Sequence, residues 1–174
     1  MRTRALAIVL IVVLACGSLV VWSRPSLAQP SATFTVTNTI DAVDSAPGDG
    51  LCDIGDDSCT LRAAIQEANA LAGADTIIVP AGLYALTISG TFEDLAATGD
   101  LDIAGDLLIQ GAGAVSTIVD GGQLDQVFQI IGTSVVTFSG LTIQNGNAAG
   151  WVDSSGNRHG PMGGAILNPA GSIT

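Results

Sequence analysis

The polar and apolar positions of the chain divide it into three kinds of segment. An apolar run, broken only at residues 17 and 18, occupies residues 5–22. Residues 61–72 carry apolar side chains at the i, i+3, i+4 spacing of an amphipathic helix. From residue 76 onward, short apolar runs alternate with turns rich in glycine and asparagine. The pattern predicts an N-terminal leader, a single helix and a series of short strands.

Residues 1–28 have the organisation of a secretory signal peptide. Arg2 and Arg4 precede the apolar run, and Ser-Leu-Ala at residues 26–28 resembles a small-x-small cleavage site. Two alternatives stay open: an uncleaved anchor, because the run approaches membrane-spanning length, and a lipoprotein modified at Cys16. We expect cleavage after residue 28 and a protein that is secreted or held at the cell surface.

The predicted helix has one continuous apolar stripe. Ser58 or Thr60 can cap its start, and Gly73 can end it. A short helix with one apolar face must bury that face against another element, so we expect it to cover the first strands that follow. The stripe consists of Leu61, Ala64, Ile65, Ala68, Leu71 and Ala72.

The strand predictions come from alternation and from short apolar runs between turn residues. Residues 32–40 alternate β-formers with polar residues. Residues 117–122 resemble residues 141–146, which lie 24 positions later, a spacing within the range of one solenoid coil. The later apolar runs are 76–79, 83–88, 101–103, 107–109, 117–119, 127–131, 135–138, 141–143 and 165–167.

These elements predict an all-β fold, a right-handed parallel β-helix (solenoid) with one N-terminal capping helix. A β-sandwich is the rival architecture, but its strands are usually longer. We place an N-terminal cap of strand, disulfide loop and helix at residues 29–75, and β-helix coils at residues 76–174. The last segment opens a new coil without a polar cap, so we expect an incomplete β-helix that continues beyond residue 174 or associates with itself through its open coil.

The charged residues of the chain limit the kinds of partner that this fold is expected to bind. The chain has a net charge of -11 and no lysine, and Arg62 and Arg158 are the only strong cations after the leader. Such a surface repels phosphate backbones, so nucleic acid is not an expected partner. A cation or a neutral ligand fits the charge better.

The strongest local motif surrounds the start of the helix. Residues 59–65 read Cys-Thr-Leu-Arg-Ala-Ala-Ile, and Ala-Asn follows at residues 68–69. This segment resembles the CSLREA-domain family of exported bacterial right-handed parallel β-helix proteins, with a likeness that spans about residues 34–174. Ala63 stands where the family has Glu, so any role of that carboxylate does not carry over. The resemblance implies a surface or secreted repeat protein and no established activity.

Four residues of this segment form the predicted cap motif. Leu61 and Ile65 lie on the apolar stripe, whereas Arg62 and Asn69 share another face with Gln66. We expect Arg62 to lock the helix over the first coil through an ion pair or carbonyl contacts, since a lone Arg in a capping motif is more often structural than ligand-binding. Gln66 should contribute little to stability.

Two cysteines remain after removal of the leader. Cys52 and Cys59 flank a short acidic loop in an exported chain, which predicts a disulfide. A metal site is the rival, but no His or further Cys lies nearby in the sequence.

Four carboxylates crowd the same loop. Asp49, Asp53, Asp56 and Asp57 could hold a hard cation such as Ca²⁺ through oxygen ligands. Their spacing does not match an EF-hand, and a solvated acidic loop is the favoured interpretation. No other cofactor is expected.

A Gly-rich stretch late in the chain gathers residues typical of a ligand-binding loop: Trp151, Asp153, Asn157, Arg158 and His159. Residues 158–160, Arg-His-Gly, resemble an element of β-helix pectin hydrolases, but the acid pair that those enzymes need is missing. No catalytic residue is therefore assigned.

Together these features predict an exported, non-catalytic structural or adhesive β-helix protein of the cell surface or extracellular space. One alternative is a polysaccharide-active β-helix enzyme, a lyase or glycosidase whose active coils lie outside this sequence. Another is a calcium-dependent carbohydrate-binding module. Carbohydrate or another surface protein is the expected partner, and no membrane contact is expected once the leader is removed.

Overall fold

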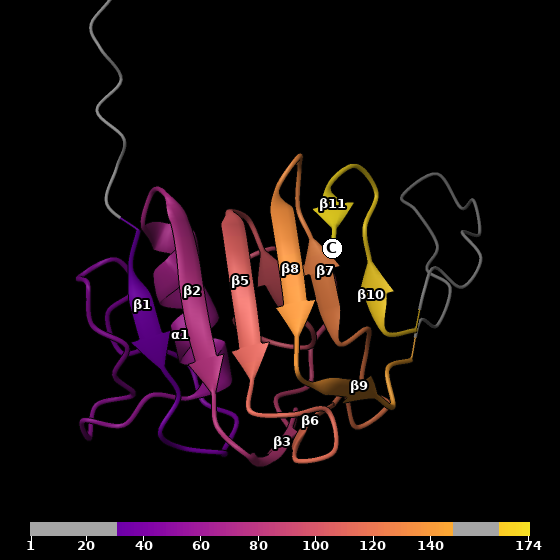
Figure 1. Ribbon diagram of the computed structural model, residues 1–174, viewed down its shortest axis with the longest axis horizontal. Coiled ribbons are helices and arrows are strands. Elements are labelled where there is room, and N and C mark those ends of the chain that lie inside the picture. The colour runs from indigo at the N-terminus through magenta and orange to yellow at the C-terminus, as the bar shows by residue number, and fades with distance from the viewer. Residues whose placement is uncertain (1–30, 148–163) are drawn as a thin grey trace, which may run out of the picture.

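The computed structural model describes residues 31–147 and 164–174 (Figure 1). The predicted leader at residues 1–28 and the predicted ligand-binding loop lie outside these described residues. Within them, no helix is long and apolar enough to cross a membrane.

The described protein is mostly β, with three parallel sheets and one short helix. The largest sheet contains β1 (Thr33–Thr35), β2 (Ala74–Val79), β5 (Asp106–Gly111), β8 (Val135–Ser139) and β11 (Ser172–Ile173), in that order. The second contains β3 (Gly82–Ala85), β6 (Thr117–Asp120) and β9 (Thr142–Gln144). The third contains β4 (Leu101–Ile103), β7 (Phe128–Ile130) and β10 (Ile166–Leu167).

From β2 onward, the chain visits the three sheets in a fixed order and then returns to the first. Figure 1 shows β2, β5 and β8 side by side with their arrows pointing the same way. In the second sheet, Ile118 pairs with Thr142 and Asp120 with Gln144. This register is the 24-residue offset that the sequence repeat predicts, so the repeat reflects real strand stacking.

The core lies between the three sheets and is built from stacked apolar positions. Phe34 pairs with Ile77, Ile77 with Ile109 and Ile109 with Phe138, which gives one apolar ladder across the largest sheet. In-register parallel pairing places side chains of the same strand face above one another. Successive strands therefore add to one continuous core.

Glycines stack at one corner of this arrangement. A Cβ added at Gly111 would lie 2.2 Å from the backbone oxygen of Gly140, and Gly140 has a φ of +65°. Gly140 follows Ser139, which pairs with Gln110, so both glycines stand at the same corner of neighbouring turns. Only glycine permits this approach of the two backbones.

Strands form at the predicted runs, but four are shorter than predicted, and the shortening is largest at residues 32–40 and at the 83–88 run. β1 ends at Thr35 because the N–H groups of Thr37 and Asn38 both donate to the Cys59 carbonyl and lead the chain out of the sheet. The 83–88 run ends as a strand at Ala85, since the N–H groups of Thr87 and Ile88 donate to the Asp41 carboxylate.

The predicted helix is α1 (Leu61–Ala70), and it packs against β2 and β4. Thr60 caps its start, because its hydroxyl accepts the N–H of Ala63 at 3.1 Å. The helix ends before Gly73, where the Leu71 N–H makes the last helical bond to Glu67. Leu61 and Ile65 are buried, as the apolar stripe predicts.

Candidate functional site

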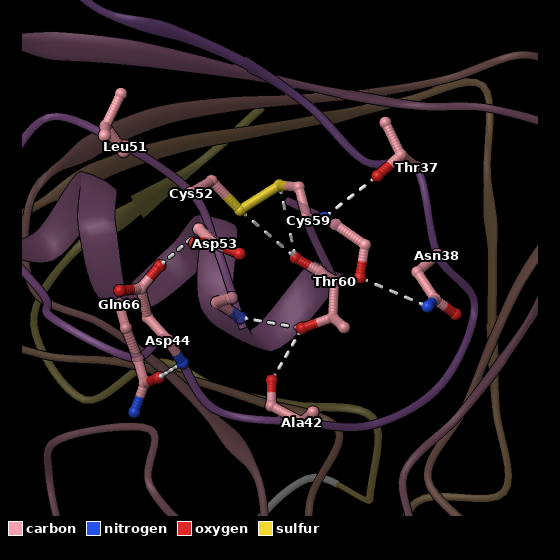
Figure 2. The surroundings of a disulfide bond; sticks show 12 residues. Thr37, Asn38, Ala42, Asp44, Leu51, Cys52, Asp53, Cys59, Thr60 and Gln66 are labelled. Atoms are coloured by element: carbon pink, nitrogen blue, oxygen red, sulfur yellow. Dashed lines mark hydrogen bonds between the residues drawn. A yellow bond between two sulfur atoms is a disulfide. The ribbon is translucent and has the colours of Figure 1, made fainter. Parts of the chain in front are cut away.

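The predicted disulfide joins Cys52 and Cys59, with their Cα atoms 5.1 Å apart (Figure 2). The bond closes the acidic loop just before α1. Its surroundings fasten this loop to the rest of the cap: the Cys59 N–H donates to the Thr37 hydroxyl, and the Thr60 hydroxyl donates to the Ala42 carbonyl. A disulfide of this kind indicates an oxidising compartment.

Loss of the disulfide should lower the free energy of unfolding. A double Cys52→Ala, Cys59→Ala variant should lose about 2.5 kcal/mol, since the bond removes loop-closure entropy from the unfolded chain. Urea unfolding of the full chain measures this loss. Reductant should destabilise the wild type by a similar amount and leave the double variant unchanged; a wild type insensitive to reductant would contradict the prediction.

The four carboxylates of the acidic loop do not converge on one point in the structure. Asp53 Oδ1 accepts the N–H groups of residues 55, 56 and 57, Asp56 accepts from Ser58, and Asp49 accepts from Leu51. Three of the four carboxylates therefore accept N–H groups of their own loop. No group of three or more His, Cys, Asp or Glu residues among the described part of the chain is placed to hold a metal ion.

Arg62 is almost completely buried, with 1% of its surface exposed. Its guanidinium forms an ion pair with Asp41, with Nε 2.6 Å from Oδ1. It also donates to the carbonyl oxygens of Ala96, Gly99 and Asp100 at 2.8 to 3.1 Å. One side chain of α1 thus joins the N-terminal segment to the segment that enters β4.

The other polar residues on this face of α1 also form hydrogen bonds to the segments that Arg62 joins. Asn69 donates to the Asp102 carbonyl and accepts the Ala104 N–H. Gln66 is buried, accepts the Asp44 N–H at 2.8 Å and donates to the Leu95 carbonyl. This burial argues against the expectation that Gln66 contributes little to stability, because the segment around residues 93–104 covers this face and removes it from water.

Truncation of Gln66 should have a measurable cost. A Gln66→Ala variant should lose about 1–2 kcal/mol, because two hydrogen bonds disappear, one of them buried. Thermal or urea unfolding of the full chain tests this. Gln110→Ala is a matched control, since Gln110 is exposed on β5 and should change stability by less than about 0.5 kcal/mol. Equal effects of the two variants would contradict the assignment.

The described surface contains an acidic cavity of about 450 Å³. It lies along the outer side of the β4-β7-β10 sheet, because Gln129 of β7 pairs with Asp102 of β4 and Leu167 of β10 pairs with Gln129. These positions alternate with core residues such as Leu101 and Phe128. The acidic cavity is lined by residues 91–94, Asp100, residues 124–126, Gln129, Asn147 and Leu167.

Polar contacts hold the walls of the acidic cavity in place. Gln129 Nε2 donates to Asp94 at 3.0 Å and ties the 91–94 wall to the sheet. The Asn147 N–H donates to the Asp125 carbonyl at 2.7 Å. Both Glu93 oxygens accept backbone N–H groups of its own loop. The lining therefore comes from three successive turns of the chain.

Two buried carboxylates lie at the base of this region. Asp100 lines the cavity and is 5% exposed, whereas Asp102 is fully buried beneath the loop and accepts the Ala96 N–H. Asp100 Oδ2 and Asp102 Oδ1 have no hydrogen-bond partner within the described residues. A buried polar atom without a hydrogen-bond partner destabilises the folded state, and a functional role is one explanation for its presence.

The environment of both carboxylates favours their protonated forms. Burial, followed by the charge of Asp125, raises the pKa of Asp100 to about 7. Burial, followed by the charge of Asp100, raises the pKa of Asp102 to about 8. Burial also raises the pKa of Asp125. Raised carboxyl pKa values within a cavity are typical of binding and catalytic sites.

Sequence reasoning did not find this site. The alternation of Asp100 and Asp102 with Leu101 and Ile103 shows that the two acids share the outer face of a strand, and this was the only signal available. The other walls come from segments without a recognisable motif, and they meet Asp100 only through the stacking of the sheets. The predicted ligand-binding residues Trp151, Asp153, Asn157, Arg158 and His159 lie outside the described residues.

The fold and the acidic cavity define a mostly β protein of parallel sheets that carries a carboxylate-rich site on the outside of one sheet. Comparison of the chain with protein-family models, with curated proteins and with solved structures finds no match. Its function has therefore to be inferred from its own residues and their geometry.

Proposed function

We propose that the chain is an exported, non-catalytic adhesive protein of the cell surface or extracellular space that binds carbohydrate in its acidic cavity. Its architecture would be a right-handed parallel β-helix capped by α1. The fixed order in which the chain visits three parallel sheets supports this architecture. The disulfide supports an oxidising location, and the likeness of residues 59–69 to the CSLREA motif supports a surface role.

The single observation that carries carbohydrate binding is the lining of the acidic cavity. It combines carboxylates with the amides of Gln126, Gln129 and Asn147, and it includes apolar patches at Leu124 and Leu167. Sugar hydroxyl groups donate to carboxylates and exchange hydrogen bonds with amides in both directions. Concave sites with a few convergent polar groups among apolar ones are typical ligand sites.

The site extends along the stack of strands. Its lining includes Asp100 next to β4, Gln129 in β7 and Leu167 in β10. Neighbouring strands lie about 4.8 Å apart, so three strands span roughly 10 Å. An elongated ligand such as an oligosaccharide matches this shape better than a compact metabolite.

A second candidate function is hydrolysis of the bound glycan. It is favoured by the pKa of Asp100, because a carboxyl group that stays partly protonated near pH 7 can act as a general acid. Glycosidases also need a second carboxylate, and Asp125 is close enough to raise the Asp100 pKa. Adhesion remains the proposal because binding needs none of the additional geometry that a bond-breaking site requires.

A glycan array probed with the full chain, recovered from outside the cytoplasm of an expression host, tests the proposal. We expect binding to at least one glycan class and no release of reducing ends from the bound glycans. Binding to no glycan on the array would overturn carbohydrate adhesion. Release of reducing ends that Asp100→Asn abolishes would replace adhesion by hydrolysis.

A further inference from the structure

We infer that the acidic cavity takes an amine-bearing glycan, a chain of 2-amino-2-deoxy sugars whose ammonium groups meet the carboxylates around Asp100. This inference rests on the proposed function and names the chemical class of its ligand. It follows from the charge of the lining, from one unpartnered carboxylate oxygen and from the place of the cavity on the sheet.

The described residues of the lining carry acid groups without a counter-charge. Four carboxylates face the cavity, those of Glu93, Asp94, Asp100 and Asp125, and no Arg, Lys or His of the described residues lines it. Charges of one sign in a cleft attract ligands of the opposite sign and repel like-charged ones. Polymers of uronic acids are therefore disfavoured, and a cationic sugar chain is favoured over a neutral one.

Asp100 supplies the second, independent observation. Three of the four carboxylates already accept N–H groups: Glu93 from Leu95 and Thr98, Asp94 from Gln129, and Asp125 from Gln126. Asp100 is 95% buried, and its Oδ2 has no partner within the described residues. An ammonium group offers both the donor and the charge that this oxygen lacks.

No cation of residues 31–147 or 164–174 fills this need. The guanidinium of Arg62 donates to the Asp100 backbone carbonyl, and its strongest contact is the ion pair with Asp41. The like charges of Asp125 and Glu93 act on Asp100 more strongly than Arg62 does. The carboxyl group of Asp100 is therefore not neutralised by a cation of the described residues.

A metal ion does not match the same carboxylates. No group of three or more potential metal ligands converges anywhere in residues 31–147 or 164–174. A divalent cation needs several oxygen atoms around one point, whereas the carboxylates of the cavity come from separate walls. A ligand chain with spaced positive charges matches carboxylates on separate walls better than a single metal ion does.

A basic peptide would carry the same charge but fits the site less well. Peptides usually join a sheet at a free strand edge, whereas the cavity lies on the outer face of the β4-β7-β10 sheet, where β7 is paired on both sides. The amides of Gln126 and Asn147 offer partners for hydroxyl groups, which a sugar chain presents at every residue.

Calorimetric titration of the full chain at pH 7 tests this inference with three probes: a glucosamine hexamer, an N-acetylglucosamine hexamer and pentalysine. We expect the glucosamine hexamer to bind at least tenfold more tightly than either other probe. Asp100→Asn and Asp125→Asn should each weaken that binding at least tenfold. Asp57→Asn removes one charge from the exposed acidic loop, outside the cavity, and should leave binding unchanged.

The outcomes separate the inference from the proposed function. Equal binding of both hexamers would overturn the ammonium assignment while carbohydrate adhesion stands. Equal binding of pentalysine and the glucosamine hexamer would replace the sugar chain by a basic peptide. An unchanged affinity of a folded Asp100→Asn variant, shown by its circular dichroism and thermal unfolding, would overturn the site itself. Failure of every array glycan and of all three probes would overturn both proposals.

Discussion

Replacement of Arg62 by Met should cost about 3–5 kcal/mol of the free energy of unfolding, the range expected when one partner of a buried ion pair is removed. The substitution leaves Asp41 without its cation, and the Asp41 side chain is only 2% exposed. It also deprives the carbonyl oxygens of Ala96, Gly99 and Asp100 of a donor. Met fills much of the vacated volume, so the loss reports on polar contacts rather than on packing.

Urea unfolding of the full chain, followed by circular dichroism, measures this effect. Arg62→Lys should fall between the wild type and Arg62→Met, because an ammonium keeps the charge but cannot reproduce the fork of the guanidinium. If Arg62→Met lost less than about 1 kcal/mol, Arg62 would not be what fixes α1 to the segment before β4.

The free energy of unfolding should fall as the pH rises from about 4 to about 8. The pKa values of Asp100 and Asp102 are about 7 and about 8 in the folded chain, against an ordinary value of 3.8. Between these values the folded state keeps protons that the unfolded state has lost, so raising the pH favours unfolding. We expect a total decrease of several kcal/mol, because one pKa unit corresponds to about 1.36 kcal/mol and both pKa values lie well above the ordinary value.

Unfolding in urea at several pH values between 4.5 and 9 tests this dependence. The double variant Asp100→Asn, Asp102→Asn should flatten the curve and be more stable than the wild type at pH 8. The groups that act on this pair are Glu93, Asp94 and Asp125, which raise its pKa values, and Arg62, which lowers that of Asp100. Asp57→Asn should keep the full slope. A wild-type stability that is flat or rises over this range would contradict the prediction.

Local pattern was enough to place most elements. The runs at residues 101–103 and 117–119 correspond to β4 and β6. Short apolar runs between Gly-rich turns are typical of strands. The helix and its Thr60 cap followed from apolar spacing and from a hydroxyl before the first turn. The disulfide followed from two cysteines that flank one short loop. Each of these features depends on residues close together in the sequence.

The tertiary structure decided where the polar residues meet. Helical spacing places Gln66 on a face away from the apolar stripe, but the segment around residues 93–104 covers that face. No periodic pattern in that segment predicted this contact. Asp41 and Asp100 lie far apart in the sequence and are joined only through Arg62.

The acidic cavity depends on the same long-range stacking. Its walls come from three successive turns of the chain, and the register of the β4-β7-β10 sheet brings them together. The strands, the helix, its cap and the disulfide could be predicted from local sequence, because these features follow from neighbouring residues. Which acids are buried and which carboxylate oxygen lacks a hydrogen-bond partner could not be predicted, because burial depends on segments that are distant along the chain.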